Sequence, residues 1–223
     1  MSDSRPTLAI LGGSGDLGGG LAFRWARAGY PVIIGSRSTA RAEEAAAALR
    51  ARGVKGEVRG LDNQAAAAAG DLLVLTVPFA SQASTLEAVR EQAQGKILID
   101  VTVPLVPPKV GTVQLPAEGS AGQIAQNLLG PGVRVVSAFQ NVAAAHLEDP
   151  EHDPDCDVLV CGDDAESCRQ VLELVAAAGM KGWHAGPIAN AAAAEAMTSV
   201  LITLNRRYRI PGAGFRITGT PQA

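Results

Sequence analysis

Short apolar runs alternate along the chain with longer stretches of helical character. The apolar runs, which predict buried strands, lie at residues 8–11, 31–35, 57–61, 72–77, 96–101 and 133–138. The stretches between them are rich in alanine or amphipathic and predict helices at 21–28, 39–52, 79–94 and 120–129. Regular alternation of strands and helices is typical of an α/β fold with a parallel sheet covered by helices.

The pattern continues beyond an acidic, proline-bearing loop at residues 149–155, which is the best candidate for a domain boundary. Strands at 157–161 and 182–185 and helices at 165–178 and 189–208 follow it. We therefore expect a main domain over residues 1–150 and a smaller C-terminal α/β domain over 151–223. The last helix is apolar nearly all round, which is typical of a helix buried in a domain or between subunits.

The first strand runs straight into a glycine-rich turn. Gly13, Gly15 and Gly18 have the spacing G-x-G-x-x-G, with a strand before them and a helix after them. Such a turn lets backbone amides approach a pyrophosphate, and the positive end of the following helix faces the same group. The spacing alone is weak, but in this context it predicts a Rossmann-type, doubly wound parallel sheet that binds a dinucleotide.

The residues after the second strand indicate which dinucleotide is bound. An NAD site usually has an Asp or Glu there, which holds two ribose hydroxyls. This chain has Ser36, Arg37, Ser38 and Arg41, with no carboxylate before Glu43. Hydroxyl and guanidinium groups suit a 2′-phosphate, so the sequence predicts NADP(H). The alternative is a helix N-cap followed by solvated arginines.

Composition and charge exclude several other classes of protein. The 223 residues carry a formal net charge of −3 without a long basic run, which argues against a nucleic-acid binder. No apolar stretch is long enough to cross a bilayer, and residues 1–6 are polar, unlike a signal peptide. The three cysteines have no zinc-ligand spacing. We expect a cytoplasmic enzyme with reduced thiols and no metal site.

Seven segments spread over nearly the whole chain share their pattern with one enzyme family. They are Leu11–Ala22, Gly35–Arg37, Leu75–Pro78, Pro104–Pro107, Cys161–Asp164, Ala185–Asn190 and Gly214–Gly219. Together they resemble the NADPH-dependent reductases of the deazaflavin coenzyme F420, the F420:NADP oxidoreductases. The glycine motif is shared by many reductases, whereas the segments at 161–164 and 186–190 are more diagnostic.

The resemblance implies hydride transfer between NADPH and F420 in a homodimer. It places NADP over Gly13, Ser14, Gly15, Asp16, Leu17, Ser36, Arg37, Arg41, Thr76, Val77 and Pro78, the last three beside the nicotinamide. It places the small-molecule acceptor near Pro104, Leu105, Val106, Gln140, Asn141 and Val142. No catalytic side chain is expected, because the two rings need only stack with the reacting carbons about 3–3.5 Å apart.

The chain departs from the family at the turn after the sixth strand. The family presents a His or Asn there, then Thr, an aliphatic residue and Pro-Ala, whereas residues 140–146 read QNVAAAH. Gln140 can still donate and accept hydrogen bonds, but the missing proline leaves the loop free to take another shape. A methanopterin-type pterin or another planar acceptor is therefore an alternative, with His146 as a proton donor or a packing residue. A non-catalytic NADPH-binding module is the third hypothesis.

Overall fold

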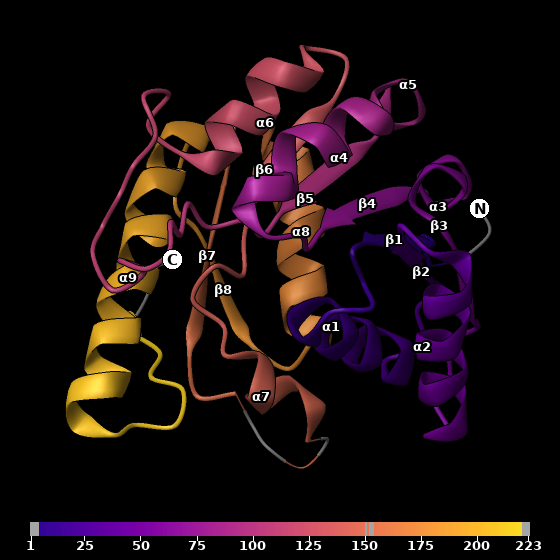
Figure 1. Ribbon diagram of the computed structural model, residues 1–223, viewed down its shortest axis with the longest axis horizontal. Coiled ribbons are helices and arrows are strands. Elements are labelled where there is room, and N and C mark those ends of the chain that lie inside the picture. Colours follow the sequence, from indigo (N-terminus) through magenta and orange to yellow (C-terminus); the bar gives the residue numbers. More distant parts are fainter. Residues whose placement is uncertain (1–4, 150, 152–153, 220–223) are drawn as a thin grey trace.

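One sheet of eight strands organises the molecule. The computed structural model describes residues 5–149, 151 and 154–219. The strand order is β3-β2-β1-β4-β5-β6-β7-β8, and β1–β6 are parallel (Figure 1). The strands are β1 (Leu8–Leu11), β2 (Val32–Ser36), β3 (Val58–Asp62), β4 (Leu72–Leu75), β5 (Ile97–Asp100), β6 (Arg134–Ser137), β7 (Asp157–Gly162) and β8 (Lys181–His184).

Helices cover both faces of the sheet. They are α1 (Asp16–Arg27), α2 (Thr39–Ala51), α3 (Asn63–Ala69), α4 (Gln82–Ala88), α5 (Arg90–Ala93), α6 (Ala121–Leu129), α7 (Ala144–Glu148), α8 (Ala165–Ala177) and α9 (Ala191–Tyr208). Short 3-10 turns, η1 (Phe79–Ser81) and η2 (Ile188–Asn190), precede α4 and α9. The predicted elements are confirmed with small differences at their ends. The predicted helix at 79–94 is divided into η1, α4 and α5, and α1 begins at Asp16 rather than at 21.

Alternation of side chains along the strands builds two separate cores. Leu8 and Ile10 of β1 pack with α1, α2 and α8 on one face, whereas Ala9 and Leu11 pack with α3 and the helices up to α6 on the other. Successive strand residues point to opposite faces, so a strand covered on both sides is apolar throughout, as β1 and β4 are. The doubly wound Rossmann-type sheet is thereby confirmed.

The direction of the chain reverses at β7. This strand is antiparallel to β6 and is joined to it by two residue pairs, Val136 with Gly162 and Ser137 with Cys161. The rest of β7, back to Asp157, therefore extends past the carboxyl end of β6 by about 13 Å at ~3.3 Å per residue. Because β8 pairs in parallel with β7, the two strands form a wall at the edge where the parallel strands end. The division into two domains at residue 150 stays a prediction.

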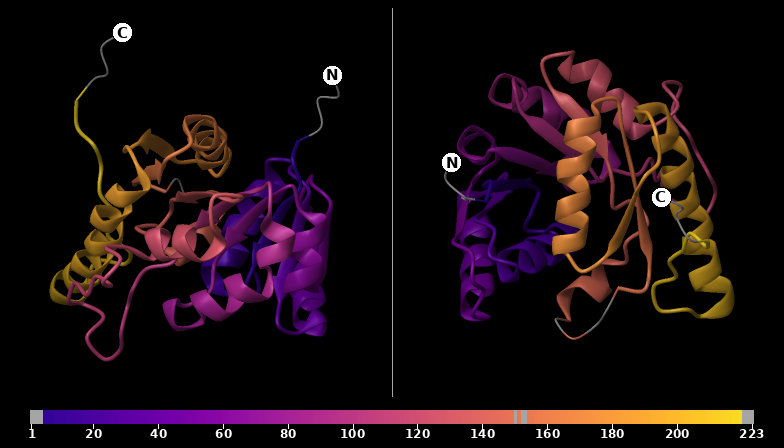
Figure 2. Two further views of the ribbon diagram at one scale, coloured as in Figure 1. Left: turned by 90° about the horizontal axis from the view of Figure 1, so that it is seen from above. Right: turned by 180° about the vertical axis from the view of Figure 1, so that it is seen from behind.

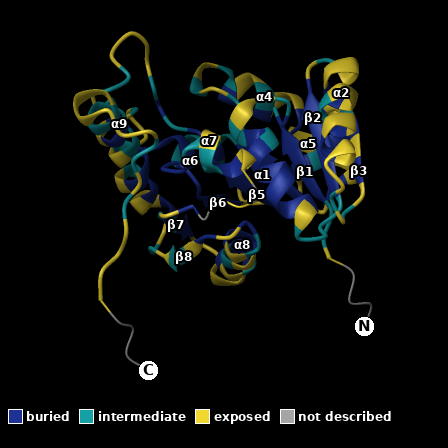
Figure 3. Cartoon of the chain, turned by 90° about the horizontal axis from the view of Figure 1, so that it is seen from below, coloured by how far each residue is buried: buried dark blue, intermediate teal, exposed yellow. Residues whose placement is uncertain are grey.

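Helix α9 lies beyond this wall, next to the long connection between β5 and α6 (Figures 1 and 2). The Thr203 hydroxyl donates to the Gly111 carbonyl of that connection at 2.8 Å. The outer side of α9 carries exposed apolar residues, with Met197 40% and Val200 42% exposed, so the helix is not buried all round (Figure 3).

Two further observations concern the described part of the chain. None of its helices is both long enough and apolar enough to cross a membrane. Cys156, Cys161 and Cys168 are free, and burial raises the pKa of each thiol to about 11, so all three are uncharged at neutral pH.

Candidate functional site

The glycine turn between β1 and α1 closes tightly. Gly12 has a φ of +82°, and the amide of Gly13 donates to the Ile10 carbonyl at 3.0 Å. A Cβ on Gly18 would lie 2.5 Å from the Thr76 hydroxyl and 2.8 Å from the Gly13 Cα, so only glycine lets α1 sit this close. Gly15 precedes the helix and supplies no side-chain cap, which leaves the first helical N–H groups available for an anion.

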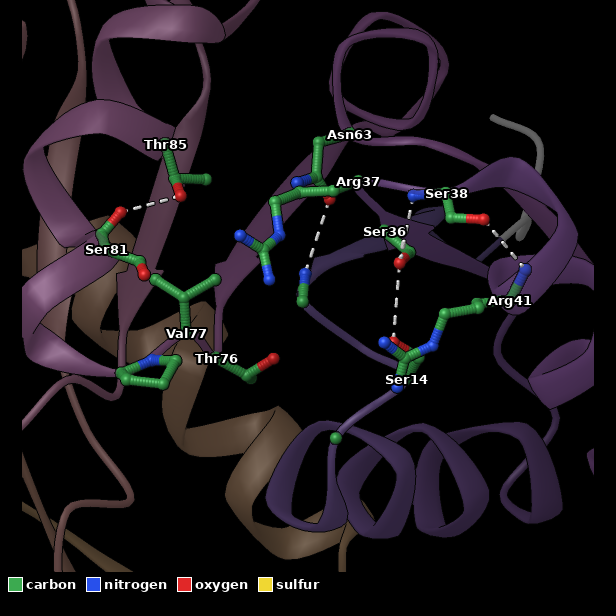
Figure 4. Close-up of a pocket in the computed structure, with 13 residues that line it drawn as sticks. Ser14, Ser36, Arg37, Ser38, Arg41, Asn63, Thr76, Val77, Ser81 and Thr85 are labelled. Carbon is green, nitrogen blue, oxygen red and sulfur yellow. Dashed lines mark hydrogen bonds between the residues drawn. The ribbon is translucent and has the colours of Figure 1, made fainter.

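A cleft of about 420 Å³ opens at this turn (Figure 4). It lies at the carboxyl ends of β1, β2 and β4, where the strand order reverses between β1 and β4. Ligands bind at this switch point in open α/β sheets. The cleft is lined by Gly12, Ser14, Gly15, Ser36, Arg37, Ser38, Arg41, Asn63, Thr76, Val77, Pro78, Ser81 and Thr85.

Two arginines from the connection between β2 and α2 give the cleft a positive end. Arg37 and Arg41 are exposed and reach toward the cleft (Figure 4). Among the described residues, neither has a carboxylate partner. Ser36 lies between them and the glycine turn, where its hydroxyl accepts from the Ser14 hydroxyl at 3.5 Å and from the Ser38 amide at 3.3 Å. Hydroxyl and guanidinium donors of this kind suit a phosphate dianion.

The first carboxylate after β2 is used elsewhere. Glu43 accepts a hydrogen bond from Arg50 at 2.5 Å and from the Gly60 amide at 3.0 Å, which ties α2 to β3. The bond from Arg50, followed by the one from Gly60, holds the pKa of Glu43 below its usual value. Among the described residues, none of those that line the cleft is an Asp or Glu, the residue that an NAD site uses to hold the ribose.

Asn63 is a cleft residue that the sequence reasoning missed. Its side-chain oxygen accepts from the Gly12 amide at 3.4 Å and would lie 2.9 Å from a Cβ on Gly35. The available signal was its position directly after β3, because the carboxyl ends of parallel strands share one edge of the sheet. Ser81 and Thr85, which also line the cleft, had no comparable signal.

Comparisons with known proteins agree with one another. The family model for "NADP oxidoreductase coenzyme F420-dependent" matches residues 7–104. An F420-dependent NADP reductase from Methanocaldococcus jannaschii is 41% identical over 219 residues, covering 95% of this chain and 97% of the relative. The chain belongs to the F420-dependent NADP reductase family. A reductase of the same name from Methanothermobacter thermautotrophicus is 38% identical, with 96% of each chain covered.

A solved structure extends the likeness to the fold. A protein from Arthrobacter, provisionally assigned as an F420-dependent NADP reductase, superposes with a TM-score of 0.77 at 27% identity. The match covers 95% of this chain and 99% of that protein. The resemblance inferred from the seven sequence segments is thus confirmed over nearly the full length.

Most of the positions predicted to bind NADP in this family come together in the cleft. They are Ser14, Gly15, Ser36, Arg37, Arg41, Thr76, Val77 and Pro78. Gly13 and Asp16 instead line a neighbouring cavity of about 200 Å³, and Leu17 packs against the core. Position 13 requires glycine, because a Cβ on this residue would lie 2.8 Å from the Ile10 carbonyl oxygen.

The predicted acceptor residues surround the ends of the next two strands. Pro104, Leu105 and Val106 follow β5, and their exposure rises along the segment from a buried Pro104 to a Val106 that is 46% exposed. Gln140, Asn141 and Val142 follow β6 and are each less than 10% exposed. Neither group lines the cleft at the glycine turn. Because neighbouring strands lie about 4.8 Å apart, the loops after β4 and β6 are about 10 Å apart along one edge.

The side chains of the turn after β6 hold the turn in place. The side-chain amide of Gln140 donates at 2.8 Å both to the Asp100 carbonyl and to the Ser137 hydroxyl. The side-chain amide of Asn141 donates to the Asp157 carbonyl at 2.8 Å, which joins the turn to the start of β7. The acceptor was predicted to bind near these residues, and their side-chain amides point inward to Asp100, Ser137 and Asp157.

His146 in α7 lies at the other side of this turn. Its Nε2 is 2.7 Å from the Pro211 carbonyl oxygen, and its ring lines a cavity of about 120 Å³ with Cys156 and Gly212. Helix α7 is itself fixed to α1 by Arg24, whose guanidinium donates to the carbonyls of His146, Leu147 and Asp149 at 2.7–3.0 Å.

Two buried carboxyl groups lie near the loops that follow β5 and β6. Asp100 is fully buried and accepts from the Gln82 amide at 2.6 Å and from the Thr102 backbone at 2.8 Å; its burial raises its pKa to about 6. Glu195 of α9 accepts from the backbone amides of Ala121 and Gly122 at the start of α6, at 2.7 and 3.1 Å. Burial, with Asp100 as a nearby like charge, raises the pKa of Glu195 to about 7.

Proposed function

We propose that this chain is an oxidoreductase that transfers hydride between NADPH and the deazaflavin coenzyme F420. The observation that carries the proposal is the pair of arginines at the ribose end of the cleft, in a chain 41% identical to an F420-dependent NADP reductase. A homodimer is proposed as well, since the exposed apolar side of α9 is a surface that a second copy would cover.

The residues of the cleft fit NADP(H). The uncapped N-terminus of α1 would bind the pyrophosphate, because its first backbone amides have no side-chain acceptor. Gly15 has no side chain that would block access to these amides. Arg37 and Arg41 would bind the 2′-phosphate. Thr76, Val77 and Pro78, at the end of β4, would flank the nicotinamide. When bound, NADPH supplies the hydride.

The acceptor would bind over the loops after β5 and β6, facing the end of β4. Among the described residues, the backbone N–H groups of Gln140 and Asn141 have no hydrogen-bond acceptor within the chain. Buried amides of this kind normally find a partner. They would donate to the polar edge of the acceptor and to the negative charge that develops on it. The wall formed by β7 and β8 would exclude water from this side.

Turnover of F420 tests the proposal. Purified protein is mixed with NADPH and F420, and the loss of deazaflavin absorbance is followed, with NADH as the control. We expect absorbance loss with NADPH and much less with NADH. Binding of NADPH without F420 turnover would refute the acceptor assignment; a methanopterin-type pterin is then the next acceptor to assay, because the turn at Gln140–Ala145 departs from the family pattern.

The assembly is tested separately. Light scattering after gel filtration is expected to give twice the chain mass of 22.8 kDa, and a mass of one chain would refute the dimer. The three free, uncharged thiols support a cytoplasmic location, where thiols remain reduced.

A further inference from the structure

The turn after β6 begins with an unusual backbone conformation. Phe139 has a φ of +72°, in the left-handed region that bulky residues rarely adopt. Among the described residues, Arg209 is the other non-glycine residue with positive φ, and it ends helix α9 at the surface, where this conformation is common. Phe139 is fully buried and ends no helix, so its conformation needs a different explanation.

The ring of Phe139 is held by a neighbour on the NADP side of the molecule. It packs edge to face against Trp25, with ring centroids 5.7 Å apart and planes at 82°. Trp25 is also fully buried, and its indole N–H donates to the Leu174 carbonyl of α8 at 2.8 Å. Trp25 lies in the last turn of α1, the helix that begins at the glycine turn, so this contact joins that helix to the turn after β6.

The backbone of the turn is held from the opposite side. The Val142 amide donates to the Phe139 carbonyl at 3.2 Å, and the Thr198 hydroxyl of α9 donates to the Gln140 carbonyl at 2.9 Å. The Asn141 side chain is bound to β7. A strained residue persists only where its surroundings determine it in this way, and such residues gather at active sites.

We propose that Phe139 is a positioning residue for the hydride acceptor. Its left-handed backbone, locked by the ring against Trp25, holds the free amides of Gln140 and Asn141 in the direction that an acceptor at the end of β6 requires. The inference rests on the proposed function, because it takes the acceptor to bind over this turn. It adds that the acceptor turn and the NADP-binding helix act as one rigid unit.

Two substitutions separate positioning from simple packing. Phe139→Ala and Phe139→Gly both remove the ring, but alanine keeps the steric cost of a positive φ and glycine does not. The glycine variant is therefore expected to melt at the higher temperature of the two. Its turn is also freer, so its kcat/KM for F420 is expected to be lower. We expect about 10-fold loss for Phe139→Ala and about 3-fold more for Phe139→Gly.

The decisive result is that Phe139→Gly has the higher melting temperature of the two variants but the lower kcat/KM for F420. NADPH affinity, measured by fluorescence titration, is expected to stay within about twofold of wild type in both variants, because the cleft residues are unchanged. Val171→Ala, a truncation buried in α8, is the matched control and is expected to lower the melting temperature without changing kcat/KM for F420. If F420 activity instead follows stability, or NADPH affinity falls in parallel, Phe139 has only a packing role.

Two further measurements keep the outcomes distinct. Phe139→Leu retains most of the buried volume but loses the edge-to-face contact, so it serves if the smaller variants fail to fold. It is expected to lose about 3-fold in kcat/KM for F420, and unchanged kinetics would overturn the proposal. Failure of the wild-type protein to reduce F420 would refute the proposed function and this inference together, whereas wild-type turnover with the wrong order of variants would refute this inference alone.

Discussion

Replacing Glu195 by glutamine is expected to change how the stability of the protein depends on pH. The wild-type carboxyl group is 1% exposed and has a pKa of about 7, compared with 4.5 in an unfolded chain. The folded state therefore holds this proton more tightly than the unfolded state. Stability from this group is fully present below pH 4.5 and is lost as the pH rises through about 7.

The size of the effect follows from the pKa. Each pH unit between the two values is worth about 1.36 kcal/mol, so the wild type loses about 3 kcal/mol of unfolding free energy across this range. Glutamine is uncharged throughout. Its side-chain NH2 group would face the backbone N–H of Ala121 or Gly122, so one hydrogen bond is lost. The free energy that this costs does not depend on pH. The informative quantity is therefore the pH slope of the difference between the two proteins.

Urea unfolding at pH 5, 6, 7 and 8 measures this difference. Relative to wild type, Glu195→Gln is expected to gain about 2.5 kcal/mol between pH 5 and pH 8, because part of the effect lies below pH 5. Asp100, whose pKa is about 6, is present in both proteins and contributes a shared slope of the same sign. Glu166→Gln, at an exposed position, is the control. Hydrogen bonds from Arg169 lower the pKa of Glu166 to about 2, so this group does not titrate between pH 5 and pH 8. A constant difference would refute the reasoning.

Three other substitutions test the site and its support. Arg37→Ala is expected to raise KM for NADPH by about 10- to 100-fold and leave KM for NADH unchanged, because one charge-assisted contact is lost. Gly18→Ala is expected to weaken NADPH binding in a fluorescence titration, since its Cβ would meet the Thr76 hydroxyl at 2.5 Å. Arg24→Ala is expected to lower unfolding free energy by about 3 kcal/mol in urea, because three carbonyls lose their donor.

Each of these has a matched control in the chain. Arg90→Ala removes an exposed arginine outside the cleft, and equal losses for NADPH and NADH in Arg37→Ala would contradict the phosphate assignment. Gly19→Ala places a Cβ 3.6 Å from the Gly13 carbonyl, an ordinary contact, and should leave binding intact. Arg27→Ala breaks an exposed ion pair with Glu151 and should cost less than about 1 kcal/mol; an equal cost for Arg24→Ala would contradict its structural role.

That most of the residues predicted to bind NADP gather in one cleft at the glycine turn was predictable, because the signals are local. The strand, glycine turn and helix are contiguous, and the arginines follow the next strand directly, so spacing alone placed Arg37 at the cleft. Asn63 reaches the cleft from 51 residues beyond its partner Gly12, which only the strand order reveals. The inward direction of Gln140 was not predictable, because it depends on Asp100 and Ser137 from neighbouring strands. The reversal at β7 likewise depends on long-range pairing.

The junction between β6 and β7 is narrow, so we expect the two sides of the sheet to unfold as separate units. Strands β1–β6 are joined by at least four residue pairs each, whereas two pairs join β6 to β7. We expect amides in the parallel part to exchange with solvent only when the whole molecule unfolds, and β7 and β8 to open as a smaller unit at lower free energy. An acceptor bound against β7 would close that smaller unit. Hydrogen exchange in β7 and β8 is thus expected to report acceptor binding separately from any measurement at the cleft of the glycine turn.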